Sequence, residues 1–379
     1  MVPRTAVKWL PALVVPAVIV AGVIAVPMQA GAAVDLPDKT PEQILLMVHD
    51  STVTSFSGSL EQSSDIGLPQ IDLSPAMSDS LPGAAGAGAV TSAMELLTGS
   101  HKARVYVDGA DKTRVQILDK MAERDVIVNG TDGWTYDSQT NEVSHVAIPA
   151  ELKSTLDAQA AERAARAPAG LATPAQLAEH FLTDIDPSTT VSVGNDGSVA
   201  GRNVYELVLT PKTTETLVES VTIAVDSETG LPLGVTVAAV GQETPAFHVA
   251  FTSVDFSTPS ADRFSFSPPA GSTVTEVPVP TASELTKMTS EAAAGEPRSD
   301  STGDMPTVTG SGWSAVAHIA ASAVPSELSA NPLLAQLTTE VAGGRALSTS
   351  LLNVFFATDG RVFVGSVPLD LLQAAAAVQ

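Results

Sequence analysis

The chain of 379 residues contains no cysteine and has few aromatic and few basic side chains. Without cysteine there is no disulfide framework, no thiolate ligand for zinc and no thiol nucleophile. Nineteen Lys and Arg stand against 42 Asp and Glu, a formal net charge of −23, so the clustered positive charge that nucleic-acid binding needs is missing. Aromatic residues make up 4% of the chain and apolar residues 44%. Any buried surface or binding site is therefore lined mainly by aliphatic side chains.

The N-terminus has the pattern of an export signal. Arg4 and Lys8 precede an apolar run over residues 9–26, and Ala30-Gly31-Ala32 has the small-x-small pattern of a signal-peptidase site. The alternative is an uncleaved membrane anchor, because a run of about 18 apolar residues is just long enough to span a bilayer. We favour cleavage after Ala32. No cysteine follows the run, which excludes a lipid anchor of the lipoprotein type.

This N-terminus predicts an exported protein. We expect a signal peptide, or an N-terminal membrane anchor, over residues 1–32. The predicted location is the extracytoplasmic cell envelope, either secreted or held at the membrane through an uncleaved N-terminal segment.

The sequence predicts two short amphipathic helices that begin with the same N-terminal capping pattern. Thr40-Pro41-Glu42-Gln43 and Thr173-Pro174-Ala175-Gln176 each place Thr as the cap, Pro in the first turn and Gln where it can reach back to the cap. Apolar side chains then follow at helical spacing. They are Ile44, Leu45 and Val48 in the first helix, and Leu177, Phe181 and Leu182 in the second.

Between and after these helices the periodicity changes to two. Val105 and Val107, and then Val115 and Ile117, alternate with polar residues, as in half-buried strands. Turn residues separate the strands, with Asn129-Gly130 and Asp132-Gly133 as hairpin dipeptides. The pattern continues through residues 191–193, 204–209, 221–225, 235–240 and 247–256. Because parallel crossovers need a dozen or more residues, these short connections predict an antiparallel meander.

Composition divides the chain beyond the predicted signal. Residues 33–277 hold the meander, and residues 278–305 are rich in Ser, Thr, Glu, Gly and Pro, as in a flexible linker. A small α+β domain is expected over 306–379. Its elements are a strand over Trp313–Ile319, a partly helical stretch over 325–341, a hairpin around Thr358-Asp359-Gly360 and a last helix over 369–378.

Catalytic motifs are missing from the sequence. The six histidines are scattered, and no two stand at the i, i+4 spacing of a helical metal site. A nucleophile elbow, a P-loop and a GxGxxG string are also absent. We therefore expect a protein that is not an enzyme and that uses no metal or cofactor.

An open sheet with helices in its hollow provides an aliphatic cavity. An acyl chain suits such a cavity, because burying each CH₂ contributes about 0.8 kcal/mol. The alternative is that the helices fill the hollow as ordinary core. The residues predicted to line the cavity are Ile44, Leu45, Val48, Val105, Val107, Val115, Ile117, Leu177, Phe181 and Leu182.

Several strings together resemble the family that contains the lipoprotein carrier LolA and the regulator RseB (MucB). They occur in the family's order over about residues 40–275. The strings are Phe56-Ser57-Gly58, GTDGWTYDSQTN over 130–141, LVLTPK over 207–212, DSETGLP over 226–232 and FSFSPP over 264–269. The C-terminal unit, with Val362 to Gly365 and Pro368, looks like the second domain of the RseB type.

The resemblance implies an α+β fold, with an unclosed antiparallel β half-barrel, helices on its concave face and a small C-terminal α+β domain. The implied function is non-enzymatic binding or carriage of lipid or an acylated lipoprotein, with acyl chains in an apolar cavity. The alternative is an RseB-like envelope-stress sensor that binds and regulates a membrane anti-sigma factor. A neighbouring gene that encodes an ABC transporter would favour the carrier function over the sensor function. One feature departs from LolA: its cavity arginine has no counterpart here, and the nearby Arg114 is displaced from that position.

Overall fold

The computed structural model describes residues 34–67, 99–119, 121–154, 187–279, 306–324 and 337–378. The predicted signal segment 1–32, the second capped helix at Thr173 and nearly all of the predicted linker 278–305 lie outside these ranges. Within them, no helix is long and apolar enough to cross a membrane.

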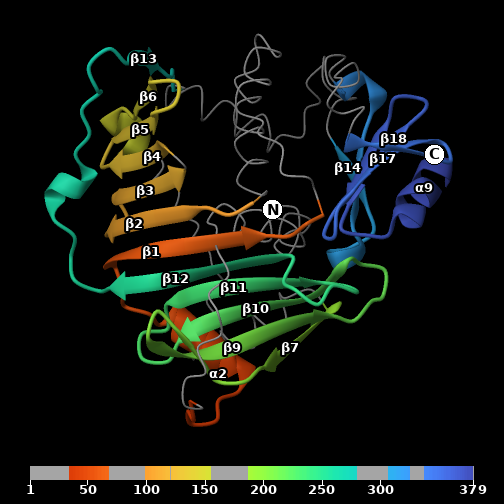
Figure 1. Cartoon of the computed structure of the whole chain (residues 1–379), viewed down its shortest axis with the longest axis horizontal. Coiled ribbons are helices and arrows are strands. Elements are labelled where there is room, and N and C mark those ends of the chain that lie inside the picture. Colours follow the sequence, from red (N-terminus) through yellow and green to blue (C-terminus); the bar gives the residue numbers. More distant parts are fainter. Residues whose placement is uncertain are drawn as a thin grey trace.

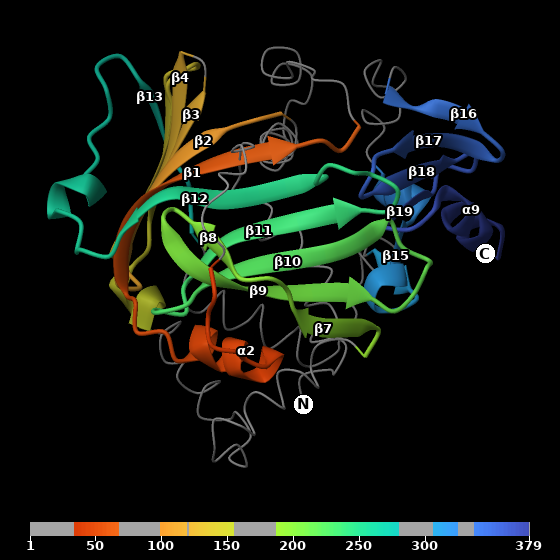
Figure 2. The same ribbon diagram turned by 60° about the horizontal axis from the view of Figure 1, so that its bottom comes forward.

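Thirteen strands form one large sheet, in the order β13-β6-β5-β4-β3-β2-β1-β12-β11-β10-β9-β7, with β8 paired to β9. The sheet is strongly bent, because β9–β11 lie face-on in Figure 2 while β2–β4 turn nearly edge-on. Its edges β13 and β7 do not pair with each other in the described part of the chain, so the predicted unclosed half-barrel is confirmed. The strands are β1 Ser55–Ser64, β2 Lys102–Asp108, β3 Lys112–Asp119, β4 Ala122–Asn129, β5 Asp132–Asp137, β6 Glu142–Ala147, β7 Thr189–Val193, β8 Gly197–Val199, β9 Arg202–Pro211, β10 Val218–Asp226, β11 Pro232–Ala239, β12 Phe247–Asp255 and β13 Thr273–Glu276.

Two local meanders make up this sheet, and one long-range pair joins them. Strands β2–β6 and strands β9–β12 each pair with neighbours in sequence, whereas β1 pairs with β12, for example Ser57 with Asp255. Every pair along the order is antiparallel except β13 with β6, which is parallel. The chain reaches β13 through the 3₁₀ turn η2, Ala261–Phe264. Figure 1 shows this connection running along the outside of β2–β6. We call residues 256–277 the strap.

The C-terminal unit is a second sheet with one helix against it. Six strands have the order β14-β15-β19-β18-β17-β16. Helix α9, Leu369–Val378, packs through Leu372 on Phe355 and Phe363. The other elements are β14 Thr307–Thr309, η3 Gly312–Ser314, β15 Val316–Ile319, η4 Ala321–Ala323, β16 Thr339–Val341, β17 Gly344–Ser348, β18 Asn353–Ala357 and β19 Val362–Gly365.

Three details differ from the sequence prediction. The hairpin between β4 and β5 turns at Gly130-Thr131, and Asp132-Gly133 belongs to β5, because Asn129 and Asp132 already form the last pair of the ladder. Trp313 lies in the 3₁₀ turn η3 rather than in a strand, since the glycines beside it bend the backbone. The end of the stretch predicted as partly helical, Thr339–Val341, is strand β16.

Helix α2, Pro41–His49, begins as its sequence predicts. The backbone N–H of Gln43 donates to Thr40 Oγ1, and the backbone N–H of Thr40 donates to Gln43 Oε1, so the capping box is complete. Nine residues are too few for a stable isolated helix, and packing has to supply the rest. Ile44 is fully buried against Tyr205, Leu207 and Val225.

The DSETGLP turn between β10 and β11 supports the other end of α2. Gly230 has a φ of +73°, and a Cβ added there would lie 2.0 Å from the carbonyl oxygen of Met47. Asp226 is fully buried beneath this turn and accepts hydrogen bonds from Arg202, from Thr229 Oγ1 and from the backbone N–H groups of Glu228 and Thr229. Glycine is therefore needed both for the backbone angle and for the close approach of the helix.

Replacing Gly230 by Ala should destabilise the protein more than replacing Gly201 by Ala. Both glycines have positive φ, which costs an L-residue roughly 1–2 kcal/mol. Only at Gly230 does the new methyl group meet backbone, because nothing lies within 4 Å of the Cβ position at Gly201. Urea unfolding measures the difference. Equal losses for the two variants would mean that α2 does not depend on this contact.

Asp226 should make stability depend on pH in the acid range. Burial alone would raise the pKa of Asp226, but the hydrogen bonds from Arg202 and Thr229 outweigh it and hold this pKa below its ordinary value. A lowered folded pKa stabilises the protein above the unfolded pKa of about 3.9, and this contribution is lost as the pH falls through the folded pKa. Asp226→Asn should therefore lower stability at neutral pH and flatten its decline below about pH 4. Glu228→Gln, which changes a mostly exposed partner of the same arginine, is the control and should keep the wild-type profile.

Candidate functional site

One face of the large sheet carries α2, and we call it the α2 face. Residues directly opposite each other in a ladder share a face, so the register extends the α2 face from strand to strand. Leu207, beneath α2, pairs with Ile223, and Ile223 pairs with Val235. The same face continues across the junction of the two meanders, where Leu60 pairs with Ala103. It then continues on β2–β4, where Val105 pairs with Val115 and Val115 with Val126.

Three zones follow one another along the α2 face. In the first zone α2 covers β7, β9 and β10. In the second zone, Trp313 of η3 belongs to one buried cluster with residues of β1, β2 and β10–β12. In the third zone, on β2–β4, aliphatic side chains remain partly exposed to solvent. They are Val105, Val107, Val115, Ile117, Val126 and Val128.

Strand β4 shows how unusual the third zone is. Val126 and Val128 are 45% and 39% exposed, whereas Asp125 and Ile127 between them are 2% and 0% exposed. The strand therefore turns two valines toward solvent and buries a carboxylate. Exposed aliphatic side chains that continue an apolar face indicate a surface that binds an apolar partner.

The strap covers the opposite face of β2–β6. Phe264 is fully buried, and Phe266 packs against Trp134 and Tyr136 with ring centroids 5.5 and 5.9 Å apart. His145 stacks on Trp134 at 3.7 Å and reaches Glu276 of β13 with Nδ1 at 2.8 Å. The aromatic side chains of this half of the sheet are thus used as core, which leaves the aliphatic α2 face as the open one.

The structure brings the predicted lining residues it describes onto one face. Ile44, Leu45 and Val48 lie in the cluster beneath α2, and Val105 borders the cluster of Trp313. Val107, Val115 and Ile117 are half-buried in the third zone. Their role in binding stays a prediction. Leu177, Phe181 and Leu182 lie outside the described residues.

Sequence reasoning missed Trp313 and the exposure of Val126 and Val128. The string Gly310-Ser311-Gly312 before Trp313 was the available signal, because glycine-rich turns let a large side chain project from a loop. Alternation in β4 was visible in the sequence. The sequence does not show which of the two faces of β4 the strap covers.

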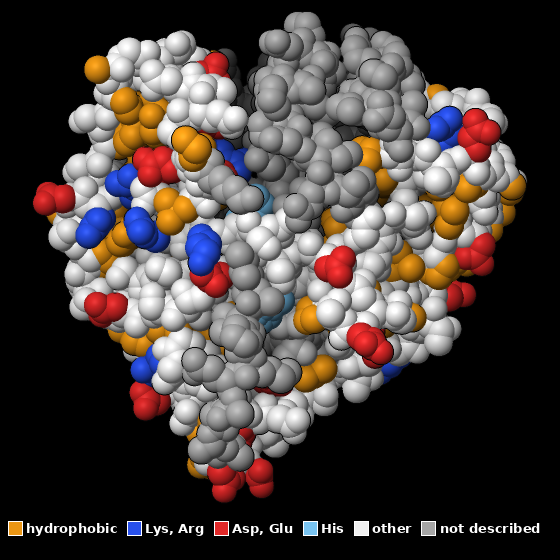
Figure 3. Space-filling model, viewed as in Figure 1, with side chains coloured by type: hydrophobic (Ala, Val, Ile, Leu, Met, Phe, Trp, Pro, Cys, Tyr) orange, Lys and Arg blue, Asp and Glu red, His pale blue; other side chains and the backbone are white. Residues whose placement is uncertain are grey.

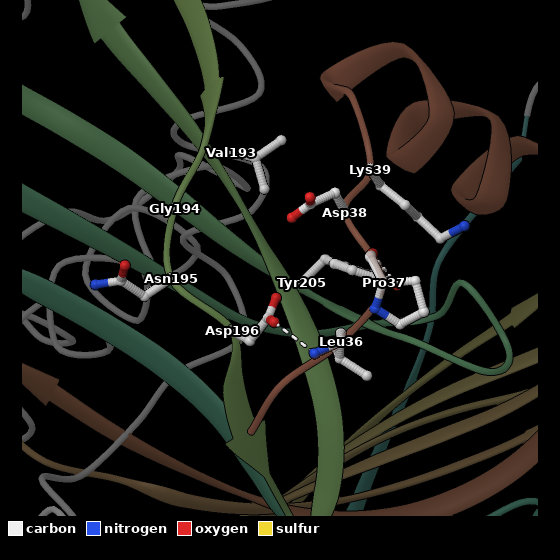
Figure 4. A pocket seen from close by; sticks show the side chains of 9 residues that line it. All are labelled: Leu36, Pro37, Asp38, Lys39, Val193, Gly194, Asn195, Asp196 and Tyr205. Atoms are coloured by element: carbon white, nitrogen blue, oxygen red, sulfur yellow. Dashed lines mark hydrogen bonds between the residues drawn. The ribbon is translucent and has the colours of Figure 1, made fainter. Parts of the chain in front are cut away.

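A separate pocket of about 310 Å³ lies where the N-terminal segment crosses the loop between β7 and β8 (Figure 4). Asp196 accepts a hydrogen bond from the backbone N–H of Leu36 at 2.8 Å, and the Tyr205 hydroxyl donates to the carbonyl oxygen of Pro37 at 3.0 Å. Burial, together with the charges of Asp196 and Asp38, raises the pKa of Tyr205. This pocket is polar and acidic, so it does not suit an acyl chain.

The acidic side chains in the view of Figure 3 are spread over several parts of the molecule. Within the described ranges, no three His, Asp or Glu side chains come together in a way that would hold a metal ion.

Residues 86–277, just over half of the chain, match the family DUF2092, described as "Predicted periplasmic protein". The chain belongs to this family. A search among curated proteins finds no match.

Several solved structures are similar to this DUF2092 protein at low sequence identity. A chain of the Pseudomonas aeruginosa MucA/MucB complex is 14% identical, with a TM-score of 0.40, and the match covers 89% of this chain and 96% of that one. A LolA superfamily protein from Nitrosomonas europaea is 11% identical, with a TM-score of 0.22 and coverage of 60% and 99%. A putative outer membrane lipoprotein-sorting protein domain from Vibrio parahaemolyticus is 9% identical, with a TM-score of 0.22 and coverage of 59% and 95%.

Arg114 does not take the place of a cavity arginine in this DUF2092 protein. It pairs across the ladder with Tyr106 and Ile127, whose face is the one that the strap covers. There its guanidinium donates to the buried carboxylate of Asp125 and to the carbonyl oxygen of Arg263 in the strap. Its position makes it part of the attachment of the strap.

Replacing Arg114 by Ala should lower stability without changing ligand uptake. The substitution leaves the buried carboxylate of Asp125 without its cation, a loss of about 3 kcal/mol for a pair of this kind. Chemical unfolding and uptake of a fluorescent fatty acid, measured on the same preparation, separate the two effects. A selective loss of uptake at unchanged stability would place Arg114 in the binding site.

Proposed function

We propose that this protein is a non-enzymatic, extracytoplasmic binding protein that holds the acyl chains of a lipid or an acylated lipoprotein on the third zone of its α2 face, which we call the open zone. The observation that carries the proposal is the row of partly exposed valines on β4, placed in register with the apolar face beneath Trp313 and α2. Membership in a family of predicted periplasmic proteins supports the location.

The chemistry of the open zone fits an acyl chain. Its side chains are aliphatic, and their ladder neighbours Thr113, Gly133 and Thr135 are small or uncharged. A charged neighbour, Arg124, stands opposite Ile117 at one end of the zone and forms an ion pair with Asp119. A methylene chain on such a surface gains about 0.8 kcal/mol for each CH₂ that it buries. The valine and isoleucine side chains that form most of the zone offer no hydrogen-bonding partner to a peptide or a sugar.

Native mass spectrometry after gentle purification tests the proposal directly. We expect a bound lipid, and we expect the emptied protein to take up a fluorescent fatty acid. Absence of both would overturn the proposal.

Two valines with similar exposure, on opposite faces of the sheet, allow a test of where the site lies. Val126 and Val274 are 45% and 44% exposed, both lie in strands, and Val274 pairs with Val143 on the strap side of the sheet. Replacing either one by Asp should change stability by a similar amount, within about 1 kcal/mol, because both are exposed strand positions. Only Val126→Asp should abolish uptake of the fluorescent fatty acid, since a carboxylate on the open zone opposes an apolar ligand. Equal uptake by the two variants would move the site away from β4.

A second candidate function is regulation of a membrane protein such as an anti-sigma factor. Its support is the second sheet, which is docked on the first through buried contacts and so offers a composite surface that a simple carrier does not need. A pull-down from solubilised membranes distinguishes the two candidates. Recovery of lipid without any membrane protein favours the carrier, whereas recovery of a single membrane protein with an exported segment favours the regulator.

A further inference from the structure

Both ring nitrogens of His145 face a carboxylate. Nδ1 lies 2.8 Å from Glu276 of β13, and Nε2 lies 3.2 Å from Asp132 of β5. The ring stacks on Trp134 with centroids 3.7 Å apart, and the histidine side chain is 13% exposed. Among the described residues these two carboxylates are the charged groups that pair with the ring. Glu142 is on the same strand but, three residues away, it points to the other face of the sheet.

This arrangement is fully hydrogen-bonded only when the imidazole is protonated. The imidazolium has two N–H donors, one for each carboxylate, whereas the neutral ring has one donor and one lone pair. The neutral ring therefore turns a lone pair toward either Glu276 or Asp132. A cation on the face of Trp134 is also favourable. Protonation thus strengthens the contact between β6, which carries His145, and β13, which carries Glu276.

In the described part of the chain, little else holds β13 on the sheet. Its four residues pair in parallel with residues 142–145 of β6, and all four are exposed. The ladder ends where the backbone N–H of Val277 donates to the carbonyl oxygen of His145 at 2.8 Å. Between Phe266 and β13 the strap has no buried residue. A segment with few buried contacts opens at a low free-energy cost, so the contact of His145 with Glu276 is a substantial part of the attachment.

The chain before β13 can turn without disturbing the rest of the strap. Gly271 has a φ of +81°, and nothing lies within 4 Å of a Cβ built there. The turn around it is closed locally, because the backbone N–H and the Oγ of Ser272 donate to the carbonyl oxygen of Pro269 at 3.1 and 2.9 Å. Nearer the start of the strap, Phe264 is fully buried. Release of β13 therefore frees the strap from about this turn onward and leaves its first half in place.

We infer that His145 is a pH-sensitive latch for the C-terminal end of the strap. The protonated ring bridges Asp132 and Glu276 and holds β13 on β6, whereas the neutral ring lets β13 open more often. Attachment therefore weakens as the pH rises through the range in which histidines titrate, between about pH 5 and pH 8. It also weakens below about pH 4, where carboxylates take up protons. Release leaves the carbonyl oxygens of Asn141 and His145 without their partners in the strap, so the pH controls access to this edge of the sheet.

Hydrogen exchange of the Thr273 and Val277 amides tests the latch, because both amides donate to β6. Their protection factors, corrected for the pH dependence of the intrinsic exchange rate, should fall as the pH rises from about pH 5 to pH 8. A fall of about two- to fivefold is the range for an exposed ion pair. The Lys212 amide, which donates to Ser188 at the opposite edge of the sheet, is the internal reference and should keep its protection. Equal changes at both edges, or no change at Thr273 and Val277, would overturn the inference.

Two carboxamide variants distinguish a latch from a purely structural histidine. Glu276→Gln changes a side chain that is 70% exposed and removes the partner on β13, so the pH dependence at Val277 should disappear. Asp132→Asn removes the partner on β5, which contacts the ring whether β13 is attached or released, so a pH dependence should remain. Persistence of the dependence in Glu276→Gln, or its loss in Asp132→Asn, would contradict the latch.

Two histidine variants complete the test. His145→Gln cannot be protonated, so the protection at Val277 should stay at the lower, alkaline value of the wild type throughout the pH range. His248→Gln is the matched control, because the ring of His248 contacts Thr236 Oγ1 and pairs with no carboxylate among the described residues. It should keep the wild-type dependence. A dependence that His248→Gln removes and His145→Gln leaves intact would assign the pH response to β12 and overturn the inference.

Discussion

An open antiparallel sheet with apolar side chains on both faces has to cover each of them, and the rest of this structure follows from that requirement. On the half formed by β2–β6 the strap covers one face with Phe264 and Phe266. On the half formed by β9–β12 the α2 face is covered by α2 and by Trp313. The α2 face of β2–β4, in contrast, keeps a row of partly exposed aliphatic side chains. The candidate site is thus the part of this face that lies beyond α2 and the cluster of Trp313.

The close packing of other groups against the sheet also explains why two positions require glycine. Gly58 lies beneath the ring of Phe251, and a Cβ added there would be 2.6 Å from that ring and 2.5 Å from the carbonyl oxygen of Ser253. Gly230 allows the end of α2 to approach the turn at Asp226. Both glycines belong to strings that resemble the LolA and RseB family, so those strings mark places where the backbone or a ring packs closely against the sheet.

Much of the fold could be predicted from the sequence, because its signals are local. The capping box at Thr40, the alternation in β2 and β3 and the turn at Asp226–Gly230 all depend on residues within a few positions of one another. The position of Trp313 could not be predicted, because it depends on a hydrogen bond to Thr189 and on a buried cluster whose other members are distant in sequence. Which face of β4 is covered could not be predicted for the same reason. Nothing in β4 itself indicates that Phe264 and Phe266 would cover Ile127 and leave Val126 open.

The pairing of β1 with β12 has a consequence for the order of folding. Each meander can form from neighbouring segments, but the large sheet becomes continuous only when Ser57 meets Asp255, nearly two hundred residues later. Closing a loop of that length has a large entropy cost, and non-local pairing of this kind slows folding. Until Asp255 has been delivered, β1 presents a bare strand edge to any other chain. Such an edge is a template for aggregation, so the interval before β12 pairs with β1 is a stage at which the folding chain is exposed to it.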